Sequence, residues 1–137
     1  MFFKKKNKIE NNFLSKVGSL LIHAAKIDQN YSDEEREIIE KTLIELGADP
    51  DKIKSLVAEA QINEENSNQI LNFTKEIKAL NDEKKIKIIE AMWRIIYSNK
   101  DADIYETNLM RRLAGLLYIE NNIMGAIKEK IKKEKSW

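Results

Sequence analysis

The sequence predicts an all-α fold, a single compact bundle of about seven helices arranged as two pseudo-repeated helix-loop-helix halves. Apolar residues recur at intervals of three and four along most of the chain, as they do on the buried faces of helices. Only one proline and four glycines occur in 137 residues, too few for the turns that many short strands require. A repeat at a spacing of 71 residues then predicts two related halves.

The first helix is expected from about residue 9 to residue 27, because its apolar residues form one continuous stripe. These residues are Phe13, Leu14, Val17, Leu20, Leu21, Ala24 and Ala25. Ser32 and Glu35 then have the spacing of a capping box, in which a hydroxyl and a carboxylate satisfy backbone N–H groups at a helix start. The second helix is expected to end at Gly47, a favoured C′ residue.

Asp49 and Pro50 suit the N-cap and first position of a third helix, which the polar run 63–68 should end. A fourth helix reaches about Asn81, and either Asn81 or Asp82 can cap the fifth. The fifth helix corresponds to the first, and its stripe includes Trp93. A sixth helix starts near Asp103. A seventh is expected from about residue 121 and should carry Ile131 before it ends among the final lysines.

The two halves share an acidic loop between their first two helices. Oxygen-bearing side chains fall at the first, third, fifth and eighth positions of each copy, as Asp28, Asn30, Ser32 and Glu35 and as Asn99, Asp101, Asp103 and Glu106. Alternate oxygens are how one segment wraps a hard cation such as Ca²⁺. Neither loop is an EF-hand, because the glycine at position six and the glutamate at position twelve are missing.

Two interpretations of these acids stay open. In the first, Ca²⁺, Mg²⁺ or Mn²⁺ binds weakly, either to ligands pooled from both loops (Asp28, Asn30, Glu35, Asp101, Asp103 and Glu106) or to one incomplete loop together with water. In the second, the same residues are local structure: Ser32, Glu35, Asp103 and Glu106 cap helices, and Asp28 closes a turn. Replacement of the acids by neutral residues distinguishes the two interpretations.

The segment Met92–Tyr118 resembles the TerB-like tellurite-resistance family, and the resemblance extends from about residue 13 to residue 127. It rests on an apolar helix, an acidic loop, a glutamate and the run Arg-Arg-Leu-Ala-Gly-Leu-Leu. The family's loop glycine is Gln29 in the first copy and Lys100 in the second, and its second-copy aspartate is Asn99. These departures weaken a cation site in the second loop, since lysine adds positive charge.

The resemblance implies a non-catalytic helical module with an acidic surface cluster that binds divalent cations and acts in stress responses through protein interaction. The residues also argue against an enzyme. The chain has no cysteine, one histidine (His23) and no glycine-rich phosphate loop, so thiol chemistry, an obvious zinc site and a nucleotide motif are missing. We expect no enzyme activity and a protein partner, with no nucleic acid bound.

Charge is unevenly distributed along the chain. Residues 1–8 and 128–137 together carry +7, so against a net charge of +1 the segment between them carries −6. We therefore expect a basic, flexible N-terminal tail (1–8), the helical domain (9–127) and a lysine-rich C-terminal end (128–137). We expect a cytoplasmic protein without a transmembrane segment. The alternative function is a metal-free adaptor, peripheral at the inner membrane surface or co-chaperone-like, that binds through these basic and apolar ends.

Overall fold

A computed structural model describes the backbone of residues 2–27, 31–67, 71–98 and 104–135, and the side chains of 12–27, 31–67, 72–75, 77–98 and 107–134. Within these ranges the chain forms helices and no strand, which confirms the predicted fold class. The elements are α1 (Phe2–Ala25), α2 (Asp33–Glu45), the 3₁₀ turn η1 (Pro50–Lys52), α3 (Ile53–Glu65), α4 (Leu71–Ile77), α5 (Asp82–Ser98), α6 (Ile104–Leu116) and α7 (Asn121–Lys135).

The helix boundaries reproduce the 71-residue repeat. Helices α2 and α6 each contain 13 residues, and both the start and the end of α6 lie 71 positions after those of α2. η1 and α7 begin at Pro50 and Asn121, again 71 positions apart. The three-helix unit α1–α2–α3 therefore corresponds to α5–α6–α7, and α4 connects the two units.

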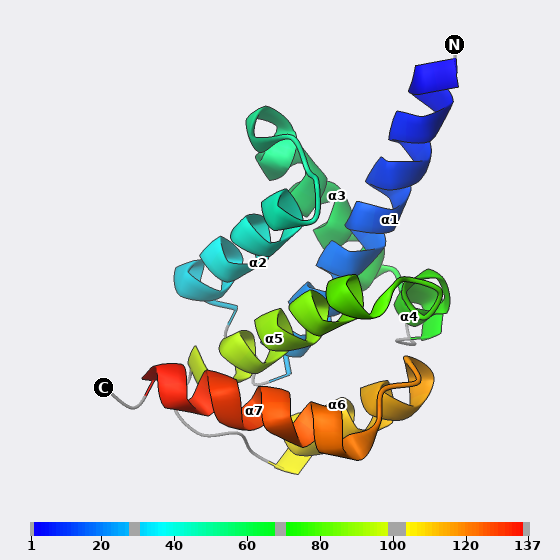
Figure 1. The fold of residues 1–137 in the computed structure, drawn as a ribbon. Helices are drawn as coiled ribbons and strands as arrows, with labels where there is room; N and C mark the ends of the chain where they lie inside the picture. Colours follow the sequence, from blue (N-terminus) through cyan, green and yellow to red (C-terminus); the bar gives the residue numbers. More distant parts are fainter. Residues whose placement is uncertain (1, 28–30, 68–70, 99–103, 136–137) are drawn as a thin grey trace.

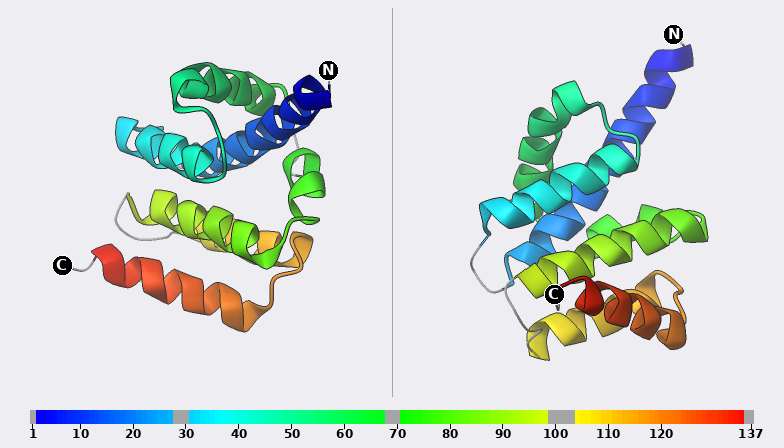
Figure 2. Two further views of the ribbon diagram at one scale, coloured as in Figure 1. Left: turned by 45° about the horizontal axis from the view of Figure 1, so that its top comes forward. Right: turned by 60° about the vertical axis from the view of Figure 1, so that its left-hand side comes forward.

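The two units lie against each other with α1 and α5 at the centre (Figure 1). α1 packs chiefly on α3 and α5 chiefly on α7, while α2 and α1 both contact α5. In Figure 2 the first unit lies above the second in both views, and α4 crosses between them at one edge. Consecutive residues Leu20, Leu21 and Ile22 are all fully buried, so α1 is covered on more than one side.

Both ends of the chain are more helical than the sequence suggests. α1 begins at Phe2 rather than near residue 9, and its first turns project beyond the other helices (Figure 1). α7 continues to Lys135 because Ile127 and Ile131 are buried against the core. The lysine-rich end is thus largely part of a packed helix. Among the described residues, no helix is both long and apolar enough to cross a bilayer.

Local capping signals in the sequence correspond to observed caps. The Asp51 N–H donates to Asp49 Oδ1 (3.0 Å) at the start of η1, and the Lys84 N–H donates to Asn81 Oδ1 (2.9 Å) at the start of α5. At the end of α2, Gly47 has a φ of +117°, and the Ala48 N–H donates to the carbonyl of Leu43 (2.9 Å). These last features form a Schellman motif, as predicted for Gly47.

Small residues allow α1 and α3 to approach closely. A Cβ at Gly18 would lie 2.9 Å from Cβ of Ala60 and 3.4 Å from Cδ1 of Leu43. Next to it, the buried Ser19 hydroxyl donates to the Ala60 carbonyl (2.8 Å), and Asn63 Nδ2 donates to Ser15 Oγ (3.1 Å). The buried polar groups between α1 and α3 are therefore hydrogen-bonded. A methyl group added at Gly18 would force the two helices apart.

Gly18→Ala is expected to lower the free energy of unfolding by about 1–3 kcal/mol, because overpacking outweighs the better helix propensity of alanine. Gly125→Ala is the matched control, since a Cβ added at this helical position would have no atom within 4 Å. It should raise the free energy of unfolding by about 0.5–1 kcal/mol. Urea denaturation measures both changes, and a stabilised Gly18→Ala protein would contradict the close approach.

Ion pairs join α5 to α7 on the surface. Arg94 Nε and Nη2 each donate to a carboxylate oxygen of Glu134 at 3.1 Å, and Lys130 pairs with Glu90. Hydrogen bonding from Arg94 lowers the pKa of the Glu134 carboxyl below its ordinary value, although partial burial opposes this shift. Because the Arg94 and Glu134 side chains are 37% and 41% exposed, solvent screens much of the attraction.

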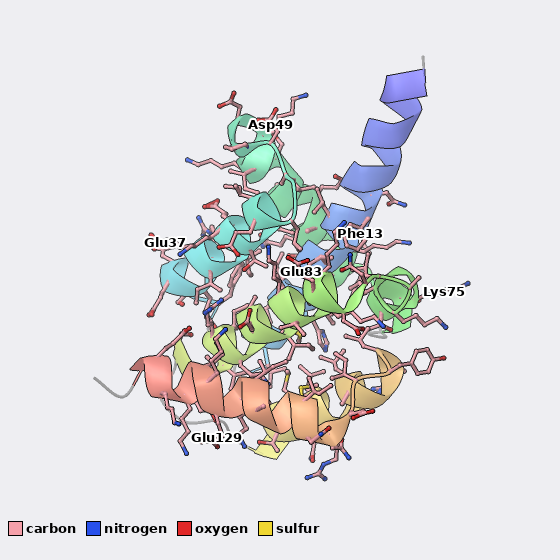
Figure 3. The ribbon with its side chains drawn as sticks, in the orientation of Figure 1. Phe13, Glu37, Asp49, Lys75, Glu83 and Glu129 are labelled. Carbon is pink, nitrogen blue, oxygen red and sulfur yellow. The ribbon has the colours of Figure 1, made fainter. Side chains whose placement is uncertain are left out.

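Glu134→Gln should reduce the free energy of unfolding at pH 7 by no more than about 0.5 kcal/mol. The lowered folded-state pKa means that this contribution is complete above the unfolded pKa of about 4.3 and disappears as pH falls through the folded pKa. Chemical denaturation between pH 7 and pH 3 should show the two proteins converging. Glu129→Gln, an exposed position on the same helix (Figure 3), should show no such convergence.

Candidate functional site

The candidate site consists of the acidic loops, which we define as residues 28–35 and 99–106. Of the six predicted cation ligands, Asp28, Asn30, Asp101 and Asp103 lie outside the described residues. Glu106 belongs to α6, but its side chain is also outside the described set. Glu35 is the predicted ligand whose side chain is described, so the pooled ligand set remains a prediction.

The helix ends that flank the acidic loops lie on one side of the molecule. The last turns of α1 and α5 and the first turns of α2 and α6 lie toward the left in the right-hand view of Figure 2. This arrangement follows from the repeat, because each unit sends its first helix toward this side and starts its second helix there. The two loops therefore connect helix ends of one region.

Glu35 and Ser32 form the predicted capping box at the start of α2. The Glu35 N–H donates to Ser32 Oγ (3.1 Å), and the Ser32 N–H donates to Glu35 Oε1 (2.8 Å). Glu35 is only 1% exposed. A cation bound by Glu35 would thus share this carboxylate with the backbone of the cap. The predicted capping roles of Ser32 and Glu35 are confirmed, whereas Asp28, the predicted turn residue, lies outside the described residues.

Tyr31 and Arg36 set the local electrostatics beside this cap. Burial raises the pKa of the Tyr31 phenol, while the positive charge of Arg36 opposes that shift and the carboxylates of Glu40 and Glu35 reinforce it. Arg36 also lies 3.5 Å from Asp33, one turn earlier on α2. The first turn of α2 contains three acidic residues, and their negative charges interact favourably with the positive end of the helix dipole.

The end of α1 is attached to α3 by a cluster that the sequence does not reveal. His23 Nδ1 lies 3.3 Å from Glu64 Oε1, and Lys26 Nζ donates to Glu64 Oε2 at 2.9 Å. The residues are 41 and 38 positions apart, so no local pattern connects them. The first acidic loop therefore follows the end of α1, which the Lys26–Glu64 ion pair attaches to α3. It is followed by the start of α2, which the capping box of Ser32 and Glu35 stabilises.

The described residues contain no group of three or more histidine, cysteine, aspartate or glutamate side chains arranged to hold a metal ion. This absence does not test the predicted ligand set, because five of its six ligands have side chains outside the described residues. The structure describes the helices on either side of each loop: α1 and α2 flank the first loop, and the equivalent helices α5 and α6 flank the second.

Comparison with known proteins identified one family. A family model described as tellurite resistance protein TerB matches residues 15–129 of the 137-residue chain. The matched span begins within α1 and ends within α7, so it includes both three-helix units and both acidic loops. No curated protein and no solved structure matches the chain.

Ser32→Ala and Glu35→Gln distinguish the contribution of the capping hydrogen bonds to stability from that of the Glu35 charge. Ser32→Ala should lower the free energy of unfolding by about 1 kcal/mol, since it removes the acceptor for the Glu35 N–H. Glutamine is an accepted partner in a capping box, so Glu35→Gln retains an acceptor for the Ser32 N–H and should cost less. Urea denaturation measures both. An equal or larger loss in Glu35→Gln would show that its charge, rather than its cap, stabilises the fold.

Proposed function

The chain belongs to the TerB family of tellurite resistance proteins, and from this premise we propose that it is a non-catalytic module that binds a divalent cation weakly. The cation site would be the acidic loops, with Asp28, Asn30, Glu35, Asp101, Asp103 and Glu106 as ligands. The module would act in a stress response by binding a protein partner. Ca²⁺, Mg²⁺ and Mn²⁺ are the candidate ions, because they prefer oxygen ligands.

The observation that carries this proposal is the repeat in three dimensions. α2 and α6 have equal length and equivalent starts, and the helix ends beside both loops gather on one side of the molecule (Figure 2). A Ca²⁺ ion takes six to eight oxygen ligands, and each loop offers four oxygen-bearing side chains. Because the helix ends that flank the two loops lie on the same side of the molecule, we expect the loops to pool their oxygens, which is why the ligand set spans both.

Cation binding would act by reducing the repulsion between clustered carboxylates. The start of α2 carries Asp33, Glu34 and Glu35 in its first turn, and the loop acid Asp28 precedes them by five residues in the sequence. Neutralisation of this charge would favour a closer arrangement of the loops. Because α2 packs against α5, which leads to the second loop, a change in one loop can alter how the two units meet. A protein partner could then detect the altered surface.

A non-catalytic role is favoured by the chemistry of the described side chains. The lone histidine, His23, faces Glu64 in an ion-pair geometry at the junction of α1 and α3. The chain has no cysteine. These features supply no nucleophile and base pair of the kind that covalent catalysis uses.

Titration of chelator-stripped protein with Ca²⁺, Mg²⁺ and Mn²⁺ by calorimetry tests the proposal. We expect saturable binding with a dissociation constant on the order of 1 mM, as in weak calcium modules. At about tenfold excess over this constant, preferential binding to the native state should raise Tm by about 5 °C. Absence of both heat and a Tm shift for all three ions would refute the cation site.

Variants locate the response. Asp28→Asn and Asp103→Asn should abolish the cation-dependent rise in Tm, and Glu35→Gln should reduce it while retaining the cap. Asp51→Asn is the matched control, because Asp51 is an exposed acid of η1 outside the acidic loops. Ser32→Ala should lower the starting Tm but leave the rise intact. A rise that survives Asp28→Asn and Asp103→Asn together would place the ion elsewhere.

A further inference from the structure

A hollow lies between α4 and the end of α6. It has a volume of about 510 Å³, within the range of about 300–1,000 Å³ that small-molecule sites occupy. We call it the α4–α6 hollow. Its lining includes Asn72, Thr74, Lys75, Lys78, Leu116 and Tyr118. It is thus a concave surface with both polar groups and an aromatic ring.

The charged residues in the described lining of the α4–α6 hollow are two lysines. Lys75 lies in the last turn of α4, and Lys78 follows directly after the end of this helix. Both residues are exposed and line the hollow. Figure 3 shows Lys75 at the outer edge of the molecule. The described residues that line the hollow include no carboxylate. Two ammonium groups without an opposing charge in this described lining favour an anion, which their attraction would concentrate there.

Tyr118 occupies a backbone conformation that tyrosine disfavours. Its φ is +56°, and among the described residues it is the sole non-glycine residue with positive φ. The Ile119 N–H donates to the Ala114 carbonyl (2.9 Å), so Tyr118 is the C′ residue of a Schellman motif at the end of α6. The equivalent residue 71 positions earlier is Gly47, which adopts this conformation without steric strain.

Packing does not account for a tyrosine at this position. The residue is 74% exposed, so it buries little apolar surface to offset the backbone strain. Strained residues that burial does not explain are concentrated at functional sites. The Lys78 ammonium lies 6.0 Å from the centre of the Tyr118 ring, near the limit of a cation–π contact. A positive charge and an exposed aromatic ring therefore stand side by side.

A buried lysine of α5 fixes the end of α6. The buried Lys85 donates from Nζ to the carbonyl of Leu117 (3.0 Å), the residue before Tyr118. This bond satisfies a terminal carbonyl and places a positive charge at the negative end of the helix. Gly115 adds open space, since no atom lies within 4 Å of where its Cβ would be. The ring is thus presented by a fixed helix end over an open hollow.

We propose that the α4–α6 hollow binds a small organic phosphate with a flat ring, of the size of a mononucleotide. Lys75 and Lys78 neutralise the phosphate, and the Tyr118 ring stacks on the flat ring of the ligand. This site is separate from the acidic loops and does not depend on a bound cation. It accounts for a tyrosine where the first half of the repeat has glycine.

Three probes test the proposal by calorimetry at low ionic strength: AMP, ribose 5-phosphate, which lacks the base, and adenosine, which lacks the phosphate. AMP should bind saturably, and each of the other two should bind at least about tenfold more weakly, corresponding to loss of one interaction. Added salt should weaken AMP binding, because the contribution of the exposed lysines is screened. Absence of saturable AMP binding, or equal affinity for AMP and ribose 5-phosphate, would overturn the proposal.

Substitutions assign the roles of the residues. Lys75→Gln and Lys78→Gln should each weaken AMP binding about tenfold, whereas Lys132→Gln, at an exposed position on α7, should leave it unchanged. Tyr118→Gly should raise Tm by a few degrees, roughly as expected for relief of strain, and should reduce AMP affinity to that of ribose 5-phosphate. Unchanged AMP affinity in Tyr118→Gly, or in the double lysine variant, would refute the assigned contacts.

Discussion

The packing of α1 against α5 is the contact on which the remaining structure depends. Both helices are the first of their unit, and both carry buried residues around more than one face, such as Leu20 to Ile22 on α1 and Ile95 to Tyr97 on α5. The helices α2, α3, α4 and α7 pack on one or both of them, and α6 is held by α4 and α7. Burial of apolar surface is the largest favourable contribution to folding, so loss of this contact would expose the interior of both units.

The two units reach the same arrangement with different side chains. Gly18 and Ala60 let α1 approach α3, whereas the positions 71 residues later are Ile89 and Ile131, both fully buried. Side-chain pairs join the corresponding helices in each unit: Glu64 pairs with Lys26 and contacts His23 in the first, and Glu134 pairs with Arg94 in the second. The two units therefore share their arrangement of helices but not all the residue pairs that join them, because His23 corresponds to Arg94 whereas Glu64 corresponds to Lys135.

Local signals in the sequence predicted much of the fold. Ser32 with Glu35, Gly47 and Asp49 were recognisable because a cap involves residues only two to five positions apart, and the helical periodicity identified Trp93 as a core residue, which is 2% exposed. The seventh helix was predicted to include Ile131, which is fully buried, and the structure continues this helix to Lys135.

The candidate site was predicted only as a set of residues. Sequence spacing marked the two acidic loops, and the family match spans both, but spacing contains no information on contacts between distant segments. The pairing of His23 with Glu64 joins residues 41 positions apart, and Lys85 reaches the end of α6 across 32 positions. The strain at Tyr118 was equally hidden, because a backbone angle depends on how the helix end is packed. Sequence therefore specified the helices, their caps and the repeat, whereas three-dimensional packing specified the ion pairs, the close helix approach and the α4–α6 hollow.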